Sequence, residues 1–395
     1  MPTWFIEPRD PLIVRDGRPF GADPGARARS LGFPMPSTTT GGLRNRAGLT
    51  KDQVFDKERV AEVLQIAVRG PLLAALDQEG RFVEWLPPAP ADALLVRDEE
   101  NHRDQLLHLV PLASPSGADY SRPAGAEALA LVGPTVAVNK KPLAQPPRYW
   151  HWDQYLQWLT EPQRLAAHLQ ANTTLGIAGP TVETRTHVSI APGTQTAEDG
   201  RLFQTNGLEF TAADQNRLAL VVESEAELPH FAQGGFAPLG GERRLMAWRP
   251  DAPQLPGCLP ALRERMLAER ACRVMLLTPA HFTAGYRPAW LLNTHGGVRA
   301  ELVAALVQRP QVISGWDMKE GKPKPTRRLA PAGSVFFLRL PETATKAQLN
   351  DWIDAIWMQN MSDDDPDDAD RDRRDGFGLA VLGAWDGKLR AMEVK

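Results

Sequence analysis

Cationic side chains gather in two stretches of this sequence. Residues 1–50 hold seven Arg and four acidic residues, and Lys319–Arg328 holds five cationic residues and one acid, Glu320. Guanidinium and ammonium groups bind phosphate oxygens, and the electrostatic part of such binding weakens as the salt concentration rises. Because the net charge of the whole chain is only −3, any nucleic-acid site must be a local patch of this kind.

In the first stretch, hydroxyl side chains coincide with the expected start of a helix. The run from Pro36 to Thr40 precedes Leu43, and Ser37 or Thr38 can cap the free N–H groups of the helix. Such a helix start binds phosphate because its N–H groups and its dipole point towards the anion. The alternative is that the hydroxyls only cap the helix and that the Arg side chains form a solvated face. The candidate contacts here are Arg15, Arg18, Ser37, Thr38, Thr39, Arg44 and Arg46.

The second stretch is kept extended by Pro323 and Pro325, and Gly333 beyond it would let a backbone approach phosphate closely. Trp316 could stack on an unpaired base, as aromatic side chains do in the recognition of single-stranded RNA. The alternatives are a solvated basic loop and a Trp that belongs to the core. The candidate contacts here are Trp316, Lys319, Lys322, Lys324, Arg327, Arg328 and Gly333.

Catalytic and metal chemistry find less support. His187 and His281 each lie beside Thr and could act in acid–base catalysis, but spacing identifies no partner for either. The turn Gly240–Arg243 offers one carboxylate where the two metals of a palm-type cyclase need paired carboxylates. The acidic run Asp363–Asp375 fails the EF-hand pattern because Arg373 takes the glycine position, so we expect a mobile, solvated connection. We therefore predict no catalytic residue, no metal site and no cofactor.

The length and composition define the class of protein. A chain of 395 residues with 43% hydrophobic residues predicts two or three domains with sizeable cores. Two Cys exclude a disulfide scaffold and a Cys-rich zinc site. We see no secretory signal and no apolar run of 18 residues, so we expect a cytoplasmic protein with no membrane partner.

Short strands with interspersed helices favour an α+β fold. Residues 184–190 alternate apolar or β-branched residues with polar ones, and with a turn at 191–200 and a return from Arg201 they predict a long hairpin at about 180–210. Arg185 and His187 lie near its base. Residues 345–359 predict a helix that begins with a capping box of Thr345 and Gln348 and has one buried stripe. Near the N-terminus, Pro8 and Pro11 favour a bent or edge strand.

Several segments, in this order and spacing, resemble one family: the third subunit of the Cmr complex, a RAMP protein of type III-B CRISPR effectors. Residues 50–150 contribute no motif to the resemblance. The segments that carry it are Phe5–Leu12, Arg15–Phe20, Phe33–Thr38, Gly42–Arg44, Gly240–Arg244, Thr278–Ala280, Ser314–Asp317, Lys322–Pro325 and Pro331–Ser334.

The resemblance implies tandem ferredoxin-like (RRM-like) RAMP domains with insertions and a β-hairpin thumb, for which the hairpin at about 180–210 is the candidate. We expect an N-terminal domain over 1–255, with an irregular insertion at about 50–150, and a C-terminal domain over 256–395. Within the thumb, Arg185 and His187 are the candidate RNA contacts.

The resemblance also implies a non-catalytic role. The subunit would hold the 5′ repeat-derived tag of the CRISPR RNA (crRNA) and meet target RNA through the guide duplex. It would bridge the large palm-domain subunit to the backbone RAMP subunit. Two alternatives stay open: a RAMP endoribonuclease that uses His187 or His281, and a purely structural bridge.

Overall fold

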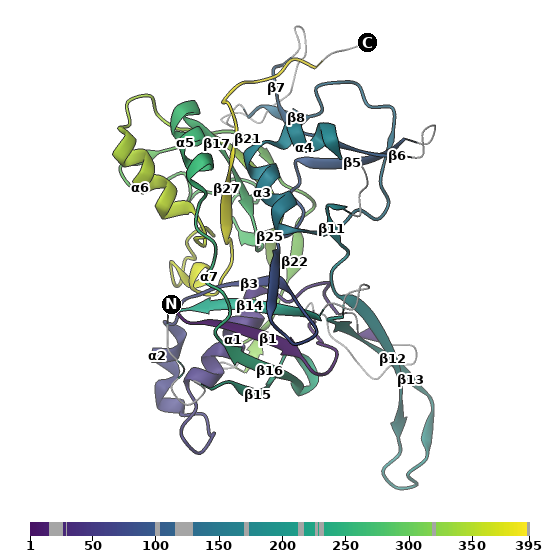
Figure 1. The fold of residues 1–395 in the computed structure, drawn as a ribbon. Helices are drawn as coiled ribbons and strands as arrows, with labels where there is room; N and C mark the ends of the chain where they lie inside the picture. The colour runs from purple at the N-terminus through teal and green to yellow at the C-terminus, as the bar shows by residue number, and fades with distance from the viewer. Residues whose placement is uncertain are drawn as a thin grey trace. The chain divides into compact units, whose positions relative to one another are not determined.

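The computed structural model groups the chain into two compact units (Figure 1). Unit 1 comprises Met1–Val83, Gly179–Gln254 and Gln311–Arg328, and unit 2 comprises Glu84–Ala178, Leu255–Pro310 and Leu329–Lys395. Both contain antiparallel sheets with helices, as expected for an α+β protein. The residues that the structure describes are 1–15, 27–28, 30–98, 103–114, 129–169, 174–211, 217–225, 228, 233–317 and 321–392.

The main sheet of unit 1 has six strands in the spatial order β15-β16-β1-β14-β3-β4. Strand β1 pairs antiparallel with both β14 and β16, so it is central, and the predicted bent or edge strand is wrong. The reason is that Pro8 is the last residue of β1 and Pro11 lies beyond it, so the ladder loses no donor inside the strand. The six strands are Gly235–Leu239 (β15), Arg244–Pro250 (β16), Thr3–Pro8 (β1), Arg217–Ser224 (β14), Val68–Leu76 (β3) and Phe82–Leu86 (β4).

Helix α1 (Pro36–Ala47) packs on one face of this sheet. A Cβ on Gly42 would lie 2.6 Å from the Leu239 side chain and 3.3 Å from the Trp248 ring, so glycine allows a close approach of helix and sheet. Leu43 and Trp248 are fully buried at this contact. Glu7 lies in β1 next to Ile6, so it points to the other face of the sheet, where it pairs with Arg217 and Arg249.

A long hairpin is present where the alternating pattern predicts it (Figure 1). Its strands are β12 (Thr181–Ile190) and β13 (Ala197–Glu209). The return strand begins at Ala197 instead of Arg201, so the turn is shorter than predicted. Strand β2 (Arg27–Ala28) pairs in parallel with β13.

The main sheet of unit 2 has four antiparallel strands in the order β21-β26-β17-β27. Helix α6 (Lys346–Ile356) begins with a capping box between Thr345 and Gln348 and buries the stripe that the sequence predicts. Helix α5 is Pro260–Glu269. The four strands are Glu301–Leu306 (β21), Val335–Arg339 (β26), Ala271–Leu276 (β17) and Ala380–Ala384 (β27).

The two sheets share one strand order. If four strands of each sheet are numbered along the chain, both read fourth, first, third, second: β16-β1-β14-β3 and β27-β17-β26-β21. Helix α1 links the first and second strands in unit 1, and α6 links the third and fourth in unit 2. This repeated order indicates two related cores.

Residues 84–178 group with unit 2, whereas the predicted N-terminal domain includes them. A buried polar network accounts for the difference. Arg273 in β17 donates to the Asp92 carboxylate and to the Trp158 carbonyl oxygen, and the Trp158 indole donates to Asp92 at 2.9 Å. All three side chains are fully buried. Earlier in the chain, β3 belongs to the sheet of unit 1 and is not irregular.

The acidic run is folded, so the predicted mobile, solvated connection is wrong. Asp363 and Asp372 are buried, and residues 371–374 form α7. The Asp363 carboxylate accepts the backbone N–H groups of Thr283 and Trp290, each at 2.9 Å, although burial raises its pKa. Backbone donors and neighbouring Arg side chains thus stabilise a segment whose composition alone indicates solvent exposure.

Short elements connect the sheets. No helix in the described parts of the chain is long and apolar enough to cross a membrane. The remaining elements are Lys57–Arg59 (η1), Val60–Leu64 (α2), Ala93–Asp98 (β5), Arg103–His108 (β6), Val110–Leu112 (β7), Leu131–Gly133 (β8), Lys141–Pro142 (β9), Tyr149–Trp150 (β10), Trp152–Thr160 (α3), Pro162–His168 (α4), Gly176–Ile177 (β11), Gly241–Arg243 (η4), Ala280–His281 (β18), Thr294–His295 (β19), Val298–Arg299 (β20), Gln311–Ile313 (β22), Trp316–Asp317 (β23), Lys322–Pro323 (β24), Arg327–Ala330 (β25) and Arg371–Arg374 (α7).

Candidate nucleic-acid interface

The start of α1 differs from the expected phosphate site. Met35 is the N-cap residue and forms no side-chain cap in the described part of the chain, so the predicted caps by Ser37 or Thr38 are wrong. Pro36 takes the first helical position, where its missing N–H costs nothing. Thr39 is fully buried, and its hydroxyl donates to the Pro36 carbonyl oxygen at 3.0 Å. Thr39 is therefore a structural residue, while Ser37 and Thr38 are half-buried.

Arg46 is also structural, contrary to the expected RNA contact. Its side chain is buried, with the guanidinium 3.9 Å from the centre of the Trp248 ring, and burial lowers its pKa to about 9. It donates to the carbonyl oxygens of Gly42 and Pro238, which fixes α1 to the sheet. Arg44 is half-buried and donates twice to the carbonyl oxygen of Ile66, at 2.8 and 3.2 Å.

Arg15 is exposed and lies 4.0 Å from Glu242. Arg18 and Lys319 lie outside the described residues. Trp316 belongs to β23, but its side chain is likewise outside the description, so stacking by Trp316 stays a prediction.

In the basic segment, Lys319–Arg328, the described strand β24 pairs antiparallel with β23. The Lys324 N–H donates to the carbonyl oxygen of Gly315 at 2.8 Å, and Ser314 donates to the Lys324 carbonyl oxygen at 2.7 Å. Lys322 and Arg328 are exposed, while Lys324 and Arg327 are half-buried. This arrangement presents several cations from one short stretch of backbone.

Gly333 does not offer its backbone to a phosphate, contrary to expectation. It is a buried residue of unit 2, and its N–H donates to the carbonyl oxygen of Leu276 at 2.7 Å. Its φ is +88°, and a Cβ would lie 2.4 Å from the Ala89 carbonyl oxygen. The glycine allows a close approach, but the approaching group is the protein's own backbone.

The base of the hairpin brings two of the predicted residues together. Arg185 pairs across the ladder with Thr205, so their side chains share one face, and the Arg185 Nε donates to Glu183 at 2.5 Å. This hydrogen bond raises the pKa of Arg185. His187, next on the same face, lies 3.0 Å from the Thr205 hydroxyl and stacks on Phe203 with ring centres 5.2 Å apart.

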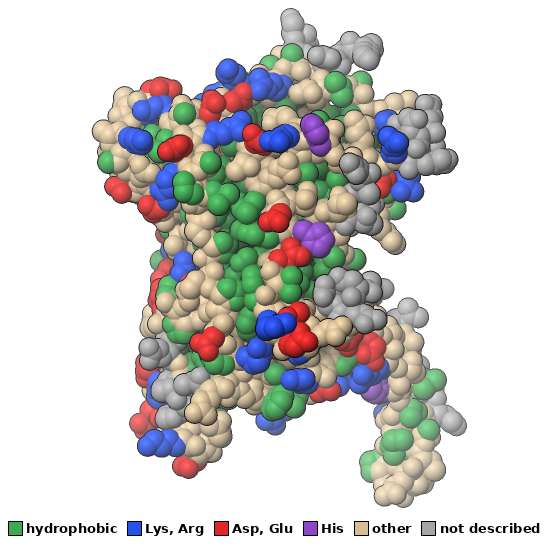
Figure 2. All heavy atoms as spheres, in the orientation of Figure 1, with side chains coloured by type: hydrophobic (Ala, Val, Ile, Leu, Met, Phe, Trp, Pro, Cys, Tyr) green, Lys and Arg blue, Asp and Glu red, His purple; other side chains and the backbone are tan. Residues whose placement is uncertain are grey.

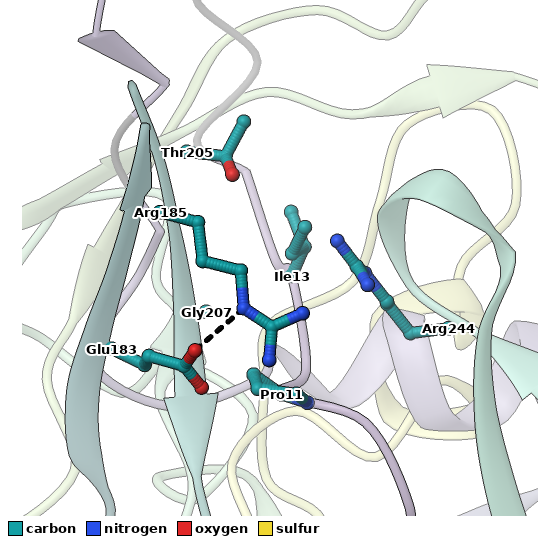
Figure 3. Close-up of a pocket in the computed structure, with 7 residues that line it drawn as sticks. All are labelled: Pro11, Ile13, Glu183, Arg185, Thr205, Gly207 and Arg244. Atoms are coloured by element: carbon teal, nitrogen blue, oxygen red, sulfur yellow. Dashed lines mark hydrogen bonds and ion pairs between the residues drawn. The ribbon is translucent and has the colours of Figure 1, made fainter. Parts of the chain in front are cut away.

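A pocket lies at this base. Figure 3 shows the guanidinium groups of Arg185 and Arg244 directed into the same space beside Pro11 and Ile13. Sequence reasoning singled out Arg185 and missed Arg244 as a contact, although Arg244 ends the Gly240–Arg244 motif of the family resemblance. The residues that form this hairpin-base pocket are Pro11, Ile13, Glu183, Arg185, Thr205, Gly207 and Arg244.

The outer part of the hairpin is apolar on its other face. Val188 and Leu202 are cross-strand partners. Their side chains are 38% and 57% exposed, and that of Ile190 is 53% exposed. Figure 2 shows apolar side chains gathered along this part of the hairpin. Such side chains can pack against the flat faces of bases, whereas the charged base of the hairpin can bind phosphate.

His281 gains a partner that spacing did not reveal. In unit 2 its Nδ1 lies 3.1 Å from a carboxylate oxygen of Asp372, which is fully buried, while the His281 side chain is 22% exposed. Folding of the acidic run onto β18 creates this pair. A His beside a carboxylate can act as a general base.

Several solved structures resemble this chain, among them the following three. A chain of the cryo-EM structure of the type III-B Cmr-beta complex bound to cognate target RNA is 15% identical, with 85% of this chain and 86% of that chain covered and a TM-score of 0.47. The structure with target RNA and AMPPnP, state 1, gives the same identity and coverage and a TM-score of 0.45. A chain of the crystal structure of the Csm3–Csm4 subcomplex of a type III-A interference complex is 9% identical, with 98% of this chain and 99% of that chain covered and a TM-score of 0.37. Among curated proteins, none matches this sequence.

A family model of CRISPR-associated proteins, Cas_Cmr3, matches residues 4–385. The match covers both sheets, the hairpin and the basic segment, and it extends through residues 50–150, where no motif carries the resemblance. The family resemblance seen in the sequence is therefore confirmed. The chain belongs to the Cmr3 family of CRISPR-associated proteins, whose members are RAMP-type subunits of type III-B Cmr effector complexes.

Proposed function

We propose that this chain is a non-catalytic, RNA-binding subunit that holds the 5′ repeat-derived tag of the crRNA. In the same complex it bridges the large palm-domain subunit to the backbone RAMP subunit and meets target RNA through the guide duplex. The observation that carries this proposal is the hairpin of unit 1, with charged and polar groups at its base and exposed apolar side chains further out. The expected cytoplasmic location stays a prediction.

The two parts of the hairpin suit two tasks. Arg185 and His187 at the base suit contacts with the sugar–phosphate backbone, which carry no sequence information. Val188, Ile190 and Leu202 suit insertion between bases, where an apolar wedge offsets lost stacking of a few kcal/mol per step. A hairpin of this kind can act as the thumb that shapes the guide–target duplex.

The basic segment supplies further backbone contacts. Lys322, Lys324 and Arg328 project from the β23–β24 pair and the strand that follows it, in the same unit as the long hairpin. Arg15 is a fourth candidate, because its side chain is exposed. The contacts proposed here are therefore fewer than the sequence candidates, because burial removes Thr39, Arg46 and Gly333.

We also propose that the two units are tandem ferredoxin-like (RRM-like) RAMP domains. Their shared strand order and the parallel strands β1 and β3, linked by α1 and separated by β14, support this assignment. Residues 84–178 then extend the second domain, and the chain re-enters that domain at residue 255.

A charge-removal variant tests RNA binding. In the purified chain, Lys322→Ala, Lys324→Ala and Arg328→Ala together should weaken binding of fluorescein-labelled crRNA. Loss of up to three phosphate contacts should reduce the slope of log K against log salt by about 2. The matched control removes three exposed cations of unit 2: Arg164, Lys346 and Lys388. Equal affinity and slope in wild type and the first variant would remove the basic segment from the interface.

The tag itself is tested in the native host by sequencing the RNA that crosslinks to this chain. RNAs that share one repeat-derived 5′ end, crosslinked to unit 1, support tag binding. Tagged RNA crosslinked only to other subunits would leave the chain as a purely structural bridge.

The His281–Asp372 pair favours a second candidate, an endoribonuclease. Metal-free incubation with repeat RNA should then yield defined products with the wild type and none with His281→Ala. Intact RNA in both reactions would exclude this candidate for repeat RNA.

A further inference from the structure

The Gly240–Arg244 turn has a strained backbone beside the hairpin-base pocket. Glu242 and Arg243 have φ values of +55° and +53°, in the left-handed region that is costly for side chains other than glycine. A Cβ on Gly240 would lie 2.4 Å from the carbonyl oxygen of Ile13, so the turn is pressed against the wall of the pocket. This packing directs the next residue, Arg244, into the pocket.

Arg244 has binding capacity that the described protein does not use. Its terminal Nη2 donates to Glu242 at 2.8 Å, but its Nε is buried and has no hydrogen-bond partner among the residues described. A buried N–H without an acceptor costs free energy. A ligand that draws the guanidinium further into the pocket would give this N–H an acceptor. The Arg185 guanidinium approaches the same space, with its Nε held by Glu183.

The remaining walls define the kind of anion. The Thr205 hydroxyl lies 3.0 Å from the His187 ring, and the buried residues Pro11 and Ile13 complete the wall of the pocket. Two guanidinium groups, those of Arg185 and Arg244, face two carboxylates, Glu183 and Glu242, and Asp10 and Glu209 also act on Arg185. Because these carboxylates repel anions, the pocket suits the single charge of a phosphodiester better than the dianion of free phosphate.

We propose that the hairpin-base pocket binds one phosphodiester group of a single RNA strand, with Arg244 and Arg185 as donors to its oxygens and Thr205 as a third. This inference rests on the proposed RNA-binding function and adds a specific subsite to it. The family's Gly240–Arg244 motif then has a physical role: its strained turn places Arg244 opposite the base of the hairpin.

The test compares two arginines of the same turn in the full-length chain. Arg244→Gln removes the donor in the pocket, and the matched control Arg243→Gln removes the same charge from an exposed neighbour outside it. Binding of a fluorescein-labelled single-stranded RNA is measured by polarisation over a salt series. Arg244→Gln should lower the affinity about tenfold and reduce the salt slope by about 0.7, and Arg243→Gln should change neither. Equal behaviour of the two variants would overturn the subsite.

A second variant and a competitor complete the test. Thr205→Val keeps the shape of the side chain and should lower the affinity about threefold without changing the salt slope, because it removes a neutral donor. The dinucleotide UpU should compete for the site, and inorganic phosphate at the same concentration should not. Stronger competition by inorganic phosphate would overturn the phosphodiester assignment in favour of a free-anion site.

The outcomes separate the two proposals. Full binding by Arg244→Gln, together with loss of binding in the Lys322/Lys324/Arg328 variant, would overturn the subsite and leave the proposed function intact. Absence of RNA binding by the wild-type chain and by its assembled complex would overturn both.

Discussion

Arg273 and Asp92 form a fully buried ion pair in unit 2, and removal of one partner should be strongly destabilising. The Arg273 guanidinium also donates to the carbonyl oxygens of Ala384 (3.0 Å) and Trp158 (2.6 Å). Arg273→Met leaves the Asp92 charge buried without its cation. Breaking such a pair costs about 3–5 kcal/mol, so the free energy of unfolding of unit 2 should fall by that amount.

The pH dependence of the free energy of unfolding gives a second estimate of what the ion pair contributes. Burial alone would raise the pKa of Asp92, but Arg273, His108 and the Trp158 indole together lower it to about 2. The unfolded value is about 4, so the lowered pKa contributes roughly 2–3 kcal/mol at neutral pH. Because the folded pKa lies below the unfolded one, this stability is present above about pH 4 and is lost as the pH falls through about 2. In Arg273→Met, burial without the cation should reverse the direction of this dependence.

The assay is urea unfolding of the full chain followed by tryptophan fluorescence, since Trp158 belongs to the network. Asp92→Leu combined with Arg273→Met removes both charges and should cost much less than the two single changes together. A loss of less than about 1 kcal/mol in Arg273→Met, or an additive double variant, would refute the reasoning. Either result would mean that the pair does not bind residues 84–178 to the second sheet.

Three further predictions follow from particular contacts. Burial lowers the pKa of His108 in the folded state, so unfolding takes up a proton and the stability should fall as the pH drops below about 6.5. The variant His108→Gln should abolish this pH dependence when urea unfolding is measured over a series of pH values. Gly333→Ala should destabilise unit 2 by about 2 kcal/mol or more in the same assay, because φ is +88°, and should leave RNA affinity unchanged. Ile190→Ser with Leu202→Ser should leave the melting temperature unchanged and weaken binding to guide–target duplex more than to crRNA alone; equal weakening for both ligands would contradict a wedge role.

Periodicity and turn chemistry predict local structure in this chain well. The alternating residues of the hairpin and the capping box at Thr345 both act over a few neighbouring residues, and the structure contains both. The partners of charged side chains are different, because they depend on contacts between distant segments. Arg46 lies against Trp248, and His281 lies against Asp372. Neither contact could be read from spacing along the chain.

Arginine-rich composition overstated the number of exposed cations for the same physical reason. A guanidinium has five N–H groups that can donate to carbonyl oxygens, and its plane can stack on an aromatic ring. It can therefore be buried at moderate cost when such partners are present. Arg44, Arg46 and Arg273 all use backbone carbonyl oxygens in this way. A count of cations treats them as exposed, whereas the fold commits them to structure.

The hairpin links the two proposed contacts by a fixed length. Arg185 and Ile190 are five residues apart in β12, and a strand rises about 3.3 Å per residue, so they are separated by about 17 Å. A stacked strand of B-form DNA advances about 3.4 Å per nucleotide and A-form RNA advances less, so this length spans at least about five nucleotides. A phosphate held in the hairpin-base pocket would therefore set where along the RNA the apolar outer part acts. Affinity at the base and disruption of stacking further out would then depend on different residues, because the charged and the apolar side chains occupy opposite faces and different positions along the strands.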